Sequence, residues 1–472
     1  MTDNKLSIVD DNRTKRYGSM TATVTLRLVR GRLDRTEYAF TERTTCILGR
    51  ANDCTPRLPD DEHHRTVSRH HCLLDINPPD VRIRDFGSLN GTFINGEKIG
   101  QRAAHQTPEE GAALPFLEHD LIDGDEIRLG KTVFRVDIRL PAGQRTLSLA
   151  QCAACGQEVG SDLGGRSGEY VCSDCQAEPG GAIRRLADLA RSGQRELAPI
   201  AGYTLLRELG RGGMGAVHLA RHDQTGREVA LKVMLPRVAA SPAARARFLR
   251  EAELTKALRH PNIAALYDSG FANGTFYFTT EFCAGGSLDQ LLARAGGRLE
   301  AAEAARLACQ ILEGLAHAHG ESVVHRDLSP HNILLGEADG PLVAKVGDFG
   351  LAKAFDQAGL SGLTRTGTTA GKPWYVPRQQ VVNFRDASPA VDVWALAACL
   401  YHALTGAHPR DFPRGKDPWQ VILQAEPVPI RRREPDIPEP LAEVIDEALR
   451  ENPKSAFQTA DELRRALLAC AR

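Results

Sequence analysis

Five short motifs, in a fixed order along the second half of the chain, constrain its fold more than any other feature of the sequence. The first is the glycine-rich string LGRGGMGAV, in which Gly210, Gly212 and Gly215 follow the spacing GxGxxG. VALK, FLREAEL, HRDLSPHN and DFG follow in that order. A glycine-rich string alone is weak evidence, because it also marks dinucleotide-binding folds and flexible turns. Five ordered motifs are very unlikely to coincide by chance.

Together the motifs resemble the signature of the protein kinases, especially the bacterial Ser/Thr kinases. The resemblance covers residues 203–470 and implies an α+β fold of two lobes, with strands first and helices second. In the helical part, Leu307, Ile311 and Leu315 recur every four residues, which places them on one face of a helix. The resemblance also implies ATP and Mg²⁺ (or Mn²⁺) as cofactors, and Ser or Thr hydroxyls of proteins as acceptors.

The resemblance gives each polar motif residue a role, because a triphosphate is densely anionic and needs cations in fixed positions. Lys232 would bind the α- and β-phosphates, and Glu251 would position Lys232. Asp348 and Asn332 would hold the metal ions, and Asp327 would orient the substrate hydroxyl and accept its proton. The residues implied to surround the nucleotide are Gly210, Gly212, Gly215, Val217, Lys232 and Glu281. Any one of these is an ordinary surface or turn residue, and only the ordered set indicates catalysis.

Three departures from the family pattern bear on activity. Ser329 stands where the catalytic loop usually carries Lys, and Lys372 stands where the substrate-side loop usually carries Thr. One cation and one hydroxyl would then still flank Asp327, although Lys372 reads equally well as a solvated loop lysine. Gln379 and Ala456 replace a Glu and an Arg that normally pair. Loss of both partners leaves no unpaired buried charge.

The resemblance also implies regulation through the segment after DFG. A phosphorylated threonine there would pair with Arg326 and order the loop. The candidates are Thr364, Thr366, Thr368 and Thr369. For any single one of them, turn composition is the simpler explanation. Asp392 corresponds to a buried carboxylate that braces the catalytic loop, and Thr280 to the residue at the back of the adenine pocket.

Residues 20–140 show short strands separated by turns, beginning with the alternating Val24, Leu26 and Leu28, which predicts an all-β sandwich. Three anchors occur within it in order: Gly49-Arg50, Ser68-x-x-His71 and Asn90-Gly91. In this setting they resemble the forkhead-associated (FHA) domain, which implies recognition of phosphothreonine.

Phosphothreonine brings about −1.5 to −2 charge and three acceptor oxygens, which an Arg and a hydroxyl can bind. The resemblance assigns these roles to Arg50 and Ser68, with Arg69 as a second cation. Asn90 would hold the peptide backbone, although Asn-Gly is also the commonest hairpin dipeptide. His71 would brace the site from beneath.

Two Cys-x-x-Cys pairs lie between the two larger regions. Cys152 and Cys155 are separated from Cys172 and Cys175 by 16 residues, a spacing typical of zinc sites with four thiolates. The segment 151–178 therefore predicts a small zinc ribbon holding structural Zn²⁺. A pair of redox disulfides is the alternative, which fits a reducing compartment less well. Residues 179–202 follow as an Arg- and Ala-rich helical linker.

Length and charge limit the remaining possibilities. A chain of 472 residues exceeds one ordinary core and predicts several domains. The net charge of −1 offers no bulk field for nucleic acid. Without a long apolar run or a signal-peptide core, and with a polar tail over 1–19, we expect no membrane span and a cytoplasmic location.

The sequence thus predicts an ATP-dependent Ser/Thr protein kinase, with FHA docking onto phosphothreonine proteins for targeting or regulation. The alternative is a phosphothreonine-reading adaptor whose kinase-like domain is catalytically feeble and serves as a scaffold. The complete set of motif residues favours the enzyme, whereas Ser329 and Lys372 favour the adaptor.

Overall fold

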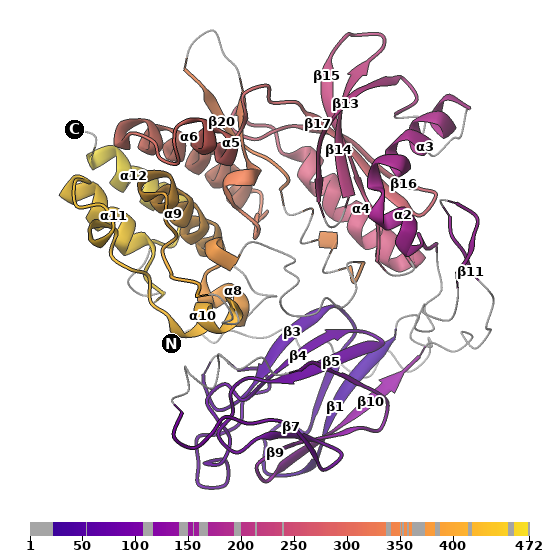
Figure 1. Cartoon of the computed structure of the whole chain (residues 1–472), viewed down its shortest axis with the longest axis vertical. Coiled ribbons are helices and arrows are strands. Elements are labelled where there is room, and N and C mark those ends of the chain that lie inside the picture. The colour runs from indigo at the N-terminus through magenta and orange to yellow at the C-terminus, as the bar shows by residue number, and fades with distance from the viewer. Residues whose placement is uncertain are drawn as a thin grey trace.

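The computed structural model of the protein describes residues 22–52, 54–106, 117–140, 150–153, 155–159, 169–192, 200–212, 215–237, 240–336, 341–349, 351, 354–355, 358–360, 373–382, 388–413, 418–451 and 457–470. Figure 1 shows an N-terminal β-sandwich, a small cysteine-containing segment followed by a helix, and a larger C-terminal unit of two lobes. In this view the sandwich lies beneath the C-terminal unit.

The sandwich consists of two antiparallel sheets whose inner faces form one core. The larger sheet has the order β2-β1-β10-β9-β6-β7, and the smaller has the order β3-β4-β5-β8. The core contains Leu26, Leu48, Leu74, Ile127 and Phe134, all fully buried. The strands are β1 (Thr23–Arg30), β2 (Glu37–Phe40), β3 (Thr44–Leu48), β4 (Cys72–Asn77), β5 (Asp80–Asp85), β6 (Thr92–Ile94), β7 (Glu97–Gly100), β8 (His119–Leu121), β9 (Glu126–Leu129) and β10 (Thr132–Arg139).

The cysteine-containing segment is short and continues directly into a helix. Its elements are β11 (Ala150–Gln151), β12 (Glu158–Val159), α2 (Ser173–Ala177) and α3 (Pro179–Arg191). Ile183, Leu186 and Ala190 of α3 are buried against the first sheet of the C-terminal unit. The segment expected as a helical linker therefore contributes a helix that covers this sheet (Figure 1).

The first lobe of the C-terminal unit is a five-stranded antiparallel sheet with one helix. The sheet has the order β13-β14-β15-β17-β16. On β15 the residues alternate, so that Leu231 and Val233 point into the core shared with α3 while Lys232 points to the other face. The elements are β13 (Tyr203–Gly212), β14 (Gly215–His222), β15 (Glu228–Met234), α4 (Pro242–Ala257), β16 (Leu266–Ala272) and β17 (Thr275–Glu281).

The second lobe is helical and is built around α9 (Ala390–Thr405), most of whose residues are apolar and buried. Leu307, Ile311 and Leu315 are buried on one face of α6, as predicted. The other elements are β18 (Gly286–Ser287), α5 (Leu288–Arg294), α6 (Ala301–Gly320), η3 (Pro330–Asn332), β19 (Ile333–Gly336), β20 (Val343–Val346), η4 (Pro373–Tyr375), α8 (Arg378–Val382), α10 (Pro418–Gln424), η5 (Ile430–Arg432), α11 (Glu439–Ala448) and α12 (Ala460–Cys470). The predicted fold class, a β-sandwich ahead of a two-lobed α+β unit, is confirmed.

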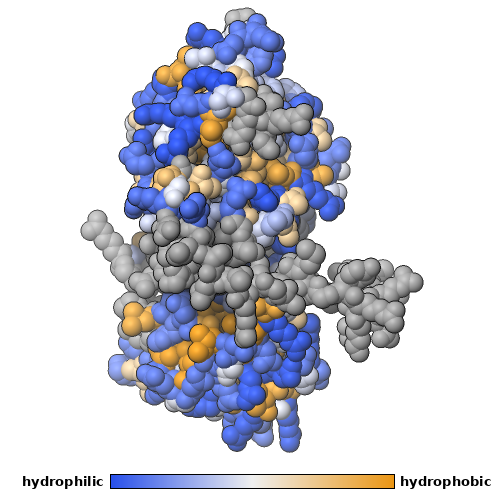
Figure 2. Space-filling view, turned by 90° about the vertical axis from the view of Figure 1, so that its right-hand side faces the viewer, coloured by the Kyte–Doolittle hydropathy of each residue, from blue (hydrophilic) through white to orange (hydrophobic). Residues whose placement is uncertain are grey.

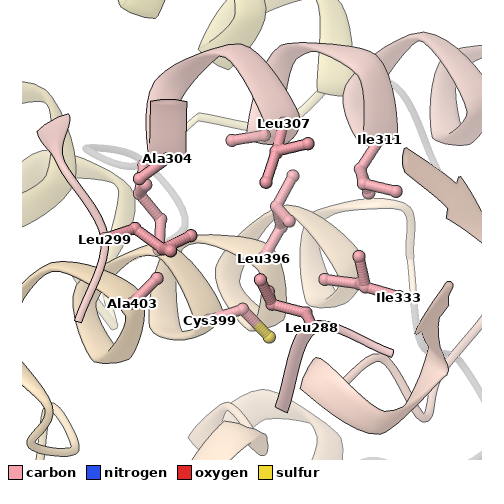
Figure 3. Close-up of a pocket in the computed structure, with 11 residues that line it drawn as sticks. Leu288, Leu299, Ala304, Leu307, Ile311, Ile333, Leu396, Cys399 and Ala403 are labelled. Atoms are coloured by element: carbon pink, nitrogen blue, oxygen red, sulfur yellow. The ribbon is translucent and has the colours of Figure 1, made fainter. Parts of the chain in front are cut away.

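One face of the molecule and one cavity of the helical lobe bear on where further ligands could bind. The face in Figure 2 is mostly hydrophilic, with hydrophobic residues in separate patches. None of the described helices is long and apolar enough to cross a membrane. A cavity of about 20 Å³ lies between α6 and α9, where Leu307 and Leu396 face each other (Figure 3). Its lining carries no charge, so it is a packing defect with room for about one water molecule.

Candidate functional site

The predicted catalytic cation and the predicted metal ligand meet at the junction of the two lobes. The Nζ atom of Lys232 lies 2.6 Å from Oδ2 of Asp348. Burial raises the pKa of the Asp348 carboxyl, but the Lys232 ammonium outweighs this and holds the pKa below its ordinary value. Asp348 is also in the left-handed region, with φ of 54°, a strained conformation that proteins retain mainly at functional sites. Asp348 is therefore an ionised carboxylate at neutral pH.

Glu251 does not join this pair. Its side chain on α4 is exposed to solvent, and among the described residues Lys232 pairs with Asp348 instead. The inward face of α4 is occupied by Phe248 and Ala252, which pack against apolar residues that follow DFG, including Phe355. The pairing of Glu251 with Lys232 that the resemblance implies is therefore absent from this arrangement of α4.

Asp327 and Asn332 lie together in the loop that precedes β19. The Nδ2 atom of Asn332 donates to the backbone oxygen of Asp327 at 2.7 Å. This leaves the amide oxygen of Asn332 as an acceptor, which is the atom a hard cation prefers. The Asp327 N–H donates to Nδ1 of His325 at 3.2 Å, so Nε2 of His325 carries the proton and donates to Gly347 at 2.9 Å. His325 therefore links the Asp327 loop to Gly347, which directly precedes Asp348.

Asp392 braces this loop from the helical core. It is fully buried, and its carboxylate accepts the backbone N–H groups of His325 at 2.8 Å and Arg326 at 2.7 Å. His319 contacts the same carboxylate at 2.8 Å. Arg326 has φ of 64°, and its carbonyl accepts Nε2 of Gln380 on α8 at 2.7 Å. The loop is thus held by α9 on one side and by α8 on the other.

The glycine-rich strands lie over the same junction. A Cβ atom on Gly215 would lie 1.8 Å from the carbonyl oxygen of Val233, so only glycine fits at this point of the pairing between β14 and β15. Val217 is the register partner of Lys232. The Glu281 carboxylate, at the end of β17, pairs with Lys345 at 2.8 Å. Gly210 lies on β13 opposite Val217, and Gly212 ends the same strand.

The segment before α8 is held by a buried ion pair that the sequence reasoning missed. Arg410 is 1% exposed and Glu451 is 7% exposed, and the two form a salt bridge. Arg410 Nη1 donates to the Val376 carbonyl at 3.2 Å, and the Arg378 N–H donates to Glu451 at 3.1 Å. Burial, together with the nearby Arg378 cation, lowers the pKa of Arg410 to about 9, so it stays charged at neutral pH. This pair fixes the segment before α8, while Gln379 is exposed.

Of the residues that the departures and the regulatory segment singled out, most lie outside the described part of the chain. Ser329 is buried in the catalytic loop, with 5% exposure. Its proposed partner Lys372 lies outside the described residues, and so does Ala456. The candidate phosphorylation sites Thr364, Thr366, Thr368 and Thr369 also lie outside them.

In the sandwich, the predicted phosphothreonine ligands lie on neighbouring loops. A Cβ atom on Gly49 would lie 2.1 Å from the Arg69 carbonyl, so glycine is required where the loops touch. Arg50 Nε donates to the Val67 carbonyl at 2.6 Å, and its guanidinium also forms a salt bridge with Asp60. The Asp60 carboxylate thus neutralises part of the Arg50 charge that a phosphate would need.

The other predicted ligands lie around the same loops. Ser68 Oγ accepts the Leu89 N–H at 3.1 Å, and Asn90 Nδ2 donates to the Thr66 carbonyl at 2.8 Å. The Ser68 N–H donates to Nδ1 of His71 at 2.9 Å, so Nε2 of His71 donates to the Gly91 carbonyl at 3.1 Å. His71 is fully buried beneath the site, and burial lowers its pKa. Arg69 is exposed.

The four paired cysteines converge on one point. The sulfur atoms of Cys152, Cys155, Cys172 and Cys175 all lie within 4.8 Å of one another, and all are free thiols. Cys155 Sγ and Cys172 Sγ are 3.7 Å apart, far from a disulfide bond and near the edge of about 3.8 Å expected for tetrahedral Zn–S bonds of about 2.3 Å. The Cys172 N–H also points at the Cys152 sulfur at 3.2 Å. This cluster could bind a metal ion.

Glu169 joins the cysteine segment to the first lobe. Its carboxylate pairs with Arg245 near the start of α4 at 2.9 Å and accepts the Gly274 N–H of the β16–β17 turn at 2.8 Å. Its backbone carbonyl accepts the Ala240 N–H at 2.8 Å. Sequence reasoning missed these contacts because Glu169 belongs to no motif.

Comparison with known families gives two matches. The model of the protein kinase domain matches residues 203–465, and that of the FHA domain matches residues 46–110.

Two curated relatives are kinases. The serine/threonine-protein kinase PknF of Mycobacterium tuberculosis (strain ATCC 25618 / H37Rv) is 36% identical over 274 residues, which cover 58% of this chain and 57% of PknF. The serine/threonine-protein kinase PrkC of Bacillus subtilis (strain 168) is 33% identical over 261 residues, which cover 55% of this chain and 39% of PrkC. The chain therefore spans only about half the length of these relatives. The solved PknI kinase domain of Mycobacterium tuberculosis is 28% identical, with a TM-score of 0.46, and the match covers 57% of this chain and 96% of that one.

Proposed function

Since the chain belongs to the protein kinase family, we propose that its C-terminal unit transfers the γ-phosphoryl group of ATP to Ser or Thr hydroxyls of proteins. The observation that carries the proposal is the meeting of Lys232 and Asp348 at the lobe junction, beside the loop of Asp327 and Asn332. Mg²⁺ or Mn²⁺, when bound, neutralises charge on the phosphates. Asp348 and Asn332 offer the oxygen ligands for such an ion, and Lys232 offers the phosphate cation.

The phosphoryl acceptor would be activated at Asp327. Its carboxylate can orient the hydroxyl and accept its proton, because Asn332 and His325 hold the loop backbone on either side.

Lys372 is proposed to supply the cation that Ser329 cannot. Removing such a cation typically lowers the rate on the order of 10²- to 10³-fold, so Lys372→Met should lower kcat sharply with little change in ATP affinity. Unchanged turnover would show that Lys372 is a solvated loop lysine with no role in catalysis.

Labelled ATP tests the activity. The purified chain with Mg²⁺ should transfer the γ-phosphoryl group to protein, and Asp348→Asn should abolish the transfer. Asp268→Asn is a matched control, since Asp268 lies on β16 and forms an ion pair with Lys256 of α4. Equal transfer by wild type and Asp348→Asn would show that the label comes from elsewhere.

The sandwich is proposed to recognise phosphothreonine through Arg50 and Ser68, with Arg69 and Asn90 contributing to the peptide contacts. The FHA match and the adjacent loops support this assignment. A phosphothreonine peptide library titrated against the chain tests it, because Arg50→Ala should lose binding. Undiminished binding would mean that the site is assigned wrongly.

The cysteine cluster is proposed to hold one structural Zn²⁺, supported by the mutual distances of its sulfurs. Four thiolates leave no open coordination position, so the role is structural or in docking.

One observation favours a second candidate function. Glu251 is exposed rather than paired with Lys232. A kinase-like domain held permanently in this arrangement would act as a phosphothreonine-reading adaptor. Purified protein that binds phosphothreonine but transfers no phosphate would support the adaptor.

A further inference from the structure

Strands β3 and β4 of the sandwich carry apolar residues on both faces. Cys46, Leu48 and Leu74 point into the sandwich core. Ile47 and Leu73 alternate with them, are register partners, and point outward. A sheet with one face in solvent carries polar residues there. The outer face of β3 and β4 is therefore built to be covered.

The cover is provided by the kinase domain of the same chain. Ile47 and Leu73 form one apolar cluster with Val381 of α8 and with Ile422 and Leu423 of α10. All five are less than a tenth exposed. The loops beside Arg50 add the buried residues Ala51, Cys54 and Phe86 to the same cluster. In Figure 1, β3 is the part of the sandwich nearest to α8 and α10.

Two polar contacts extend the interface toward the lobe junction. Asn77, 2% exposed at the end of β4, donates from Nδ2 to the Gly359 carbonyl at 3.0 Å. Gly359 lies in the segment after DFG, whose apolar residues pack under α4. Glu42 pairs with Arg247 of α4 at 3.3 Å. The sandwich thus contacts the elements that hold Glu251 away from Lys232.

The covered face borders the catalytic loop. Gln380 of α8 donates to the carbonyl of Arg326, which directly precedes Asp327. Val381 of α8 belongs to the cluster that the sandwich covers, and Val376 packs against the same cluster. The covered face is therefore continuous with the helix that holds the loop of Asp327.

We propose that the outer face of β3 and β4 is a docking surface for the α8–α10 face of the kinase domain, and that docking closes the catalytic site to protein substrates. The closure part rests on the proposed kinase activity, whereas the docking part does not. The apolar cluster involves α8 and α10 of the helical lobe, whereas the two polar contacts reach α4 and the segment after DFG.

Full-length Leu73→Asp tests the proposal, because it places a charge in the interface while the core face of β4 is retained. Ile122→Asp is the matched control, since Ile122 is 69% exposed in the same sandwich. Hydrogen exchange should rise in residues 418–424 for Leu73→Asp and stay at the wild-type level for Ile122→Asp. Leu73→Ser provides a milder variant if Leu73→Asp fails to fold.

The second arm measures phosphate transfer to dephosphorylated casein. If the docked state outnumbers the open state about ten to one, kcat/KM for casein should rise about tenfold in Leu73→Asp. Unchanged exchange in 418–424 would overturn docking. Increased exchange without increased transfer, in a protein that does phosphorylate casein, would overturn closure. Absence of transfer from every form would instead refute the kinase activity, and closure with it, while the exchange data still report docking.

Discussion

At the residue scale, the structure contains a buried ion pair that no sequence motif reveals. Gln379 and Ala456 together predicted that an ion pair of the family had been dismantled. The structure places a different buried pair, Arg410 with Glu451, where it binds the backbone before α8. Motif reasoning compares fixed positions, so it detects the missing charges but not new ones supplied from other loops.

Breaking this pair should be costly because it leaves one buried charge uncompensated. Arg410→Met or Glu451→Met should each lower the free energy of unfolding by about 3–5 kcal/mol, measured by denaturant titration. The double variant Arg410→Met/Glu451→Met should recover part of the loss, since both charges are then removed. Arg221→Met, which breaks an exposed pair with Glu228, is the control and should cost less than about 1 kcal/mol. Additive losses in the double variant would contradict coupling between Arg410 and Glu451.

A second prediction at this scale concerns Asp60, which binds Arg50 in the peptide-free sandwich. Because a phosphate must displace it, Asp60→Asn should tighten binding of a phosphothreonine peptide by about two- to fivefold in a titration. Glu62→Gln removes an exposed charge from the same loop and should leave the affinity nearly unchanged. Weaker binding by Asp60→Asn would show that Asp60 helps to build the site.

At the element scale, composition concealed the role of α3. Its Arg- and Ala-rich sequence predicted a linker helix, yet Ile183, Leu186 and Ala190 cover the sheet of the first lobe. Their spacing of three and four residues was a visible signal of a buried face. The strands, the long helix α6 and the converging cysteines were all predictable, because local periodicity or fixed spacing encodes them. The contact between Glu169 and α4 was not, since it depends on tertiary packing.

Loss of the metal ion should therefore also change the protection of residues outside the cysteine cluster. Metal analysis should find one zinc ion per chain in the wild type and none in Cys152→Ser/Cys172→Ser. It should also raise hydrogen exchange at the start of α4, because Glu169 anchors Arg245 from the same segment. Cys309→Ser, outside the cluster, should retain both the zinc and the protection. An unchanged zinc content in the double variant would refute the site, and unchanged exchange would refute the link to α4.

At the scale of the whole molecule, the sequence predicted a set of candidate catalytic residues but not their arrangement. Lys232, Asp348, Asp327 and Asn332 are brought together, whereas Glu251 faces solvent. Two arrangements of one sequence can differ by only a few kcal/mol, so motifs cannot select between them. The cover on β3 and β4 was likewise hidden, because it joins segments more than 300 residues apart, as from Ile47 to Ile422.

The central claim is that this chain is a catalyst rather than a scaffold, and Asp327 tests it most directly. Asp327→Asn keeps the size of the side chain and leaves Lys232 and Asp348 in place, so Mg²⁺–ATP binding measured by calorimetry should persist. Mass spectrometry should find phosphorylated Ser or Thr with the wild type and at least about 10²-fold less with Asp327→Asn. Equal phosphorylation by both proteins, or binding of ATP without transfer by the wild type, would contradict the account.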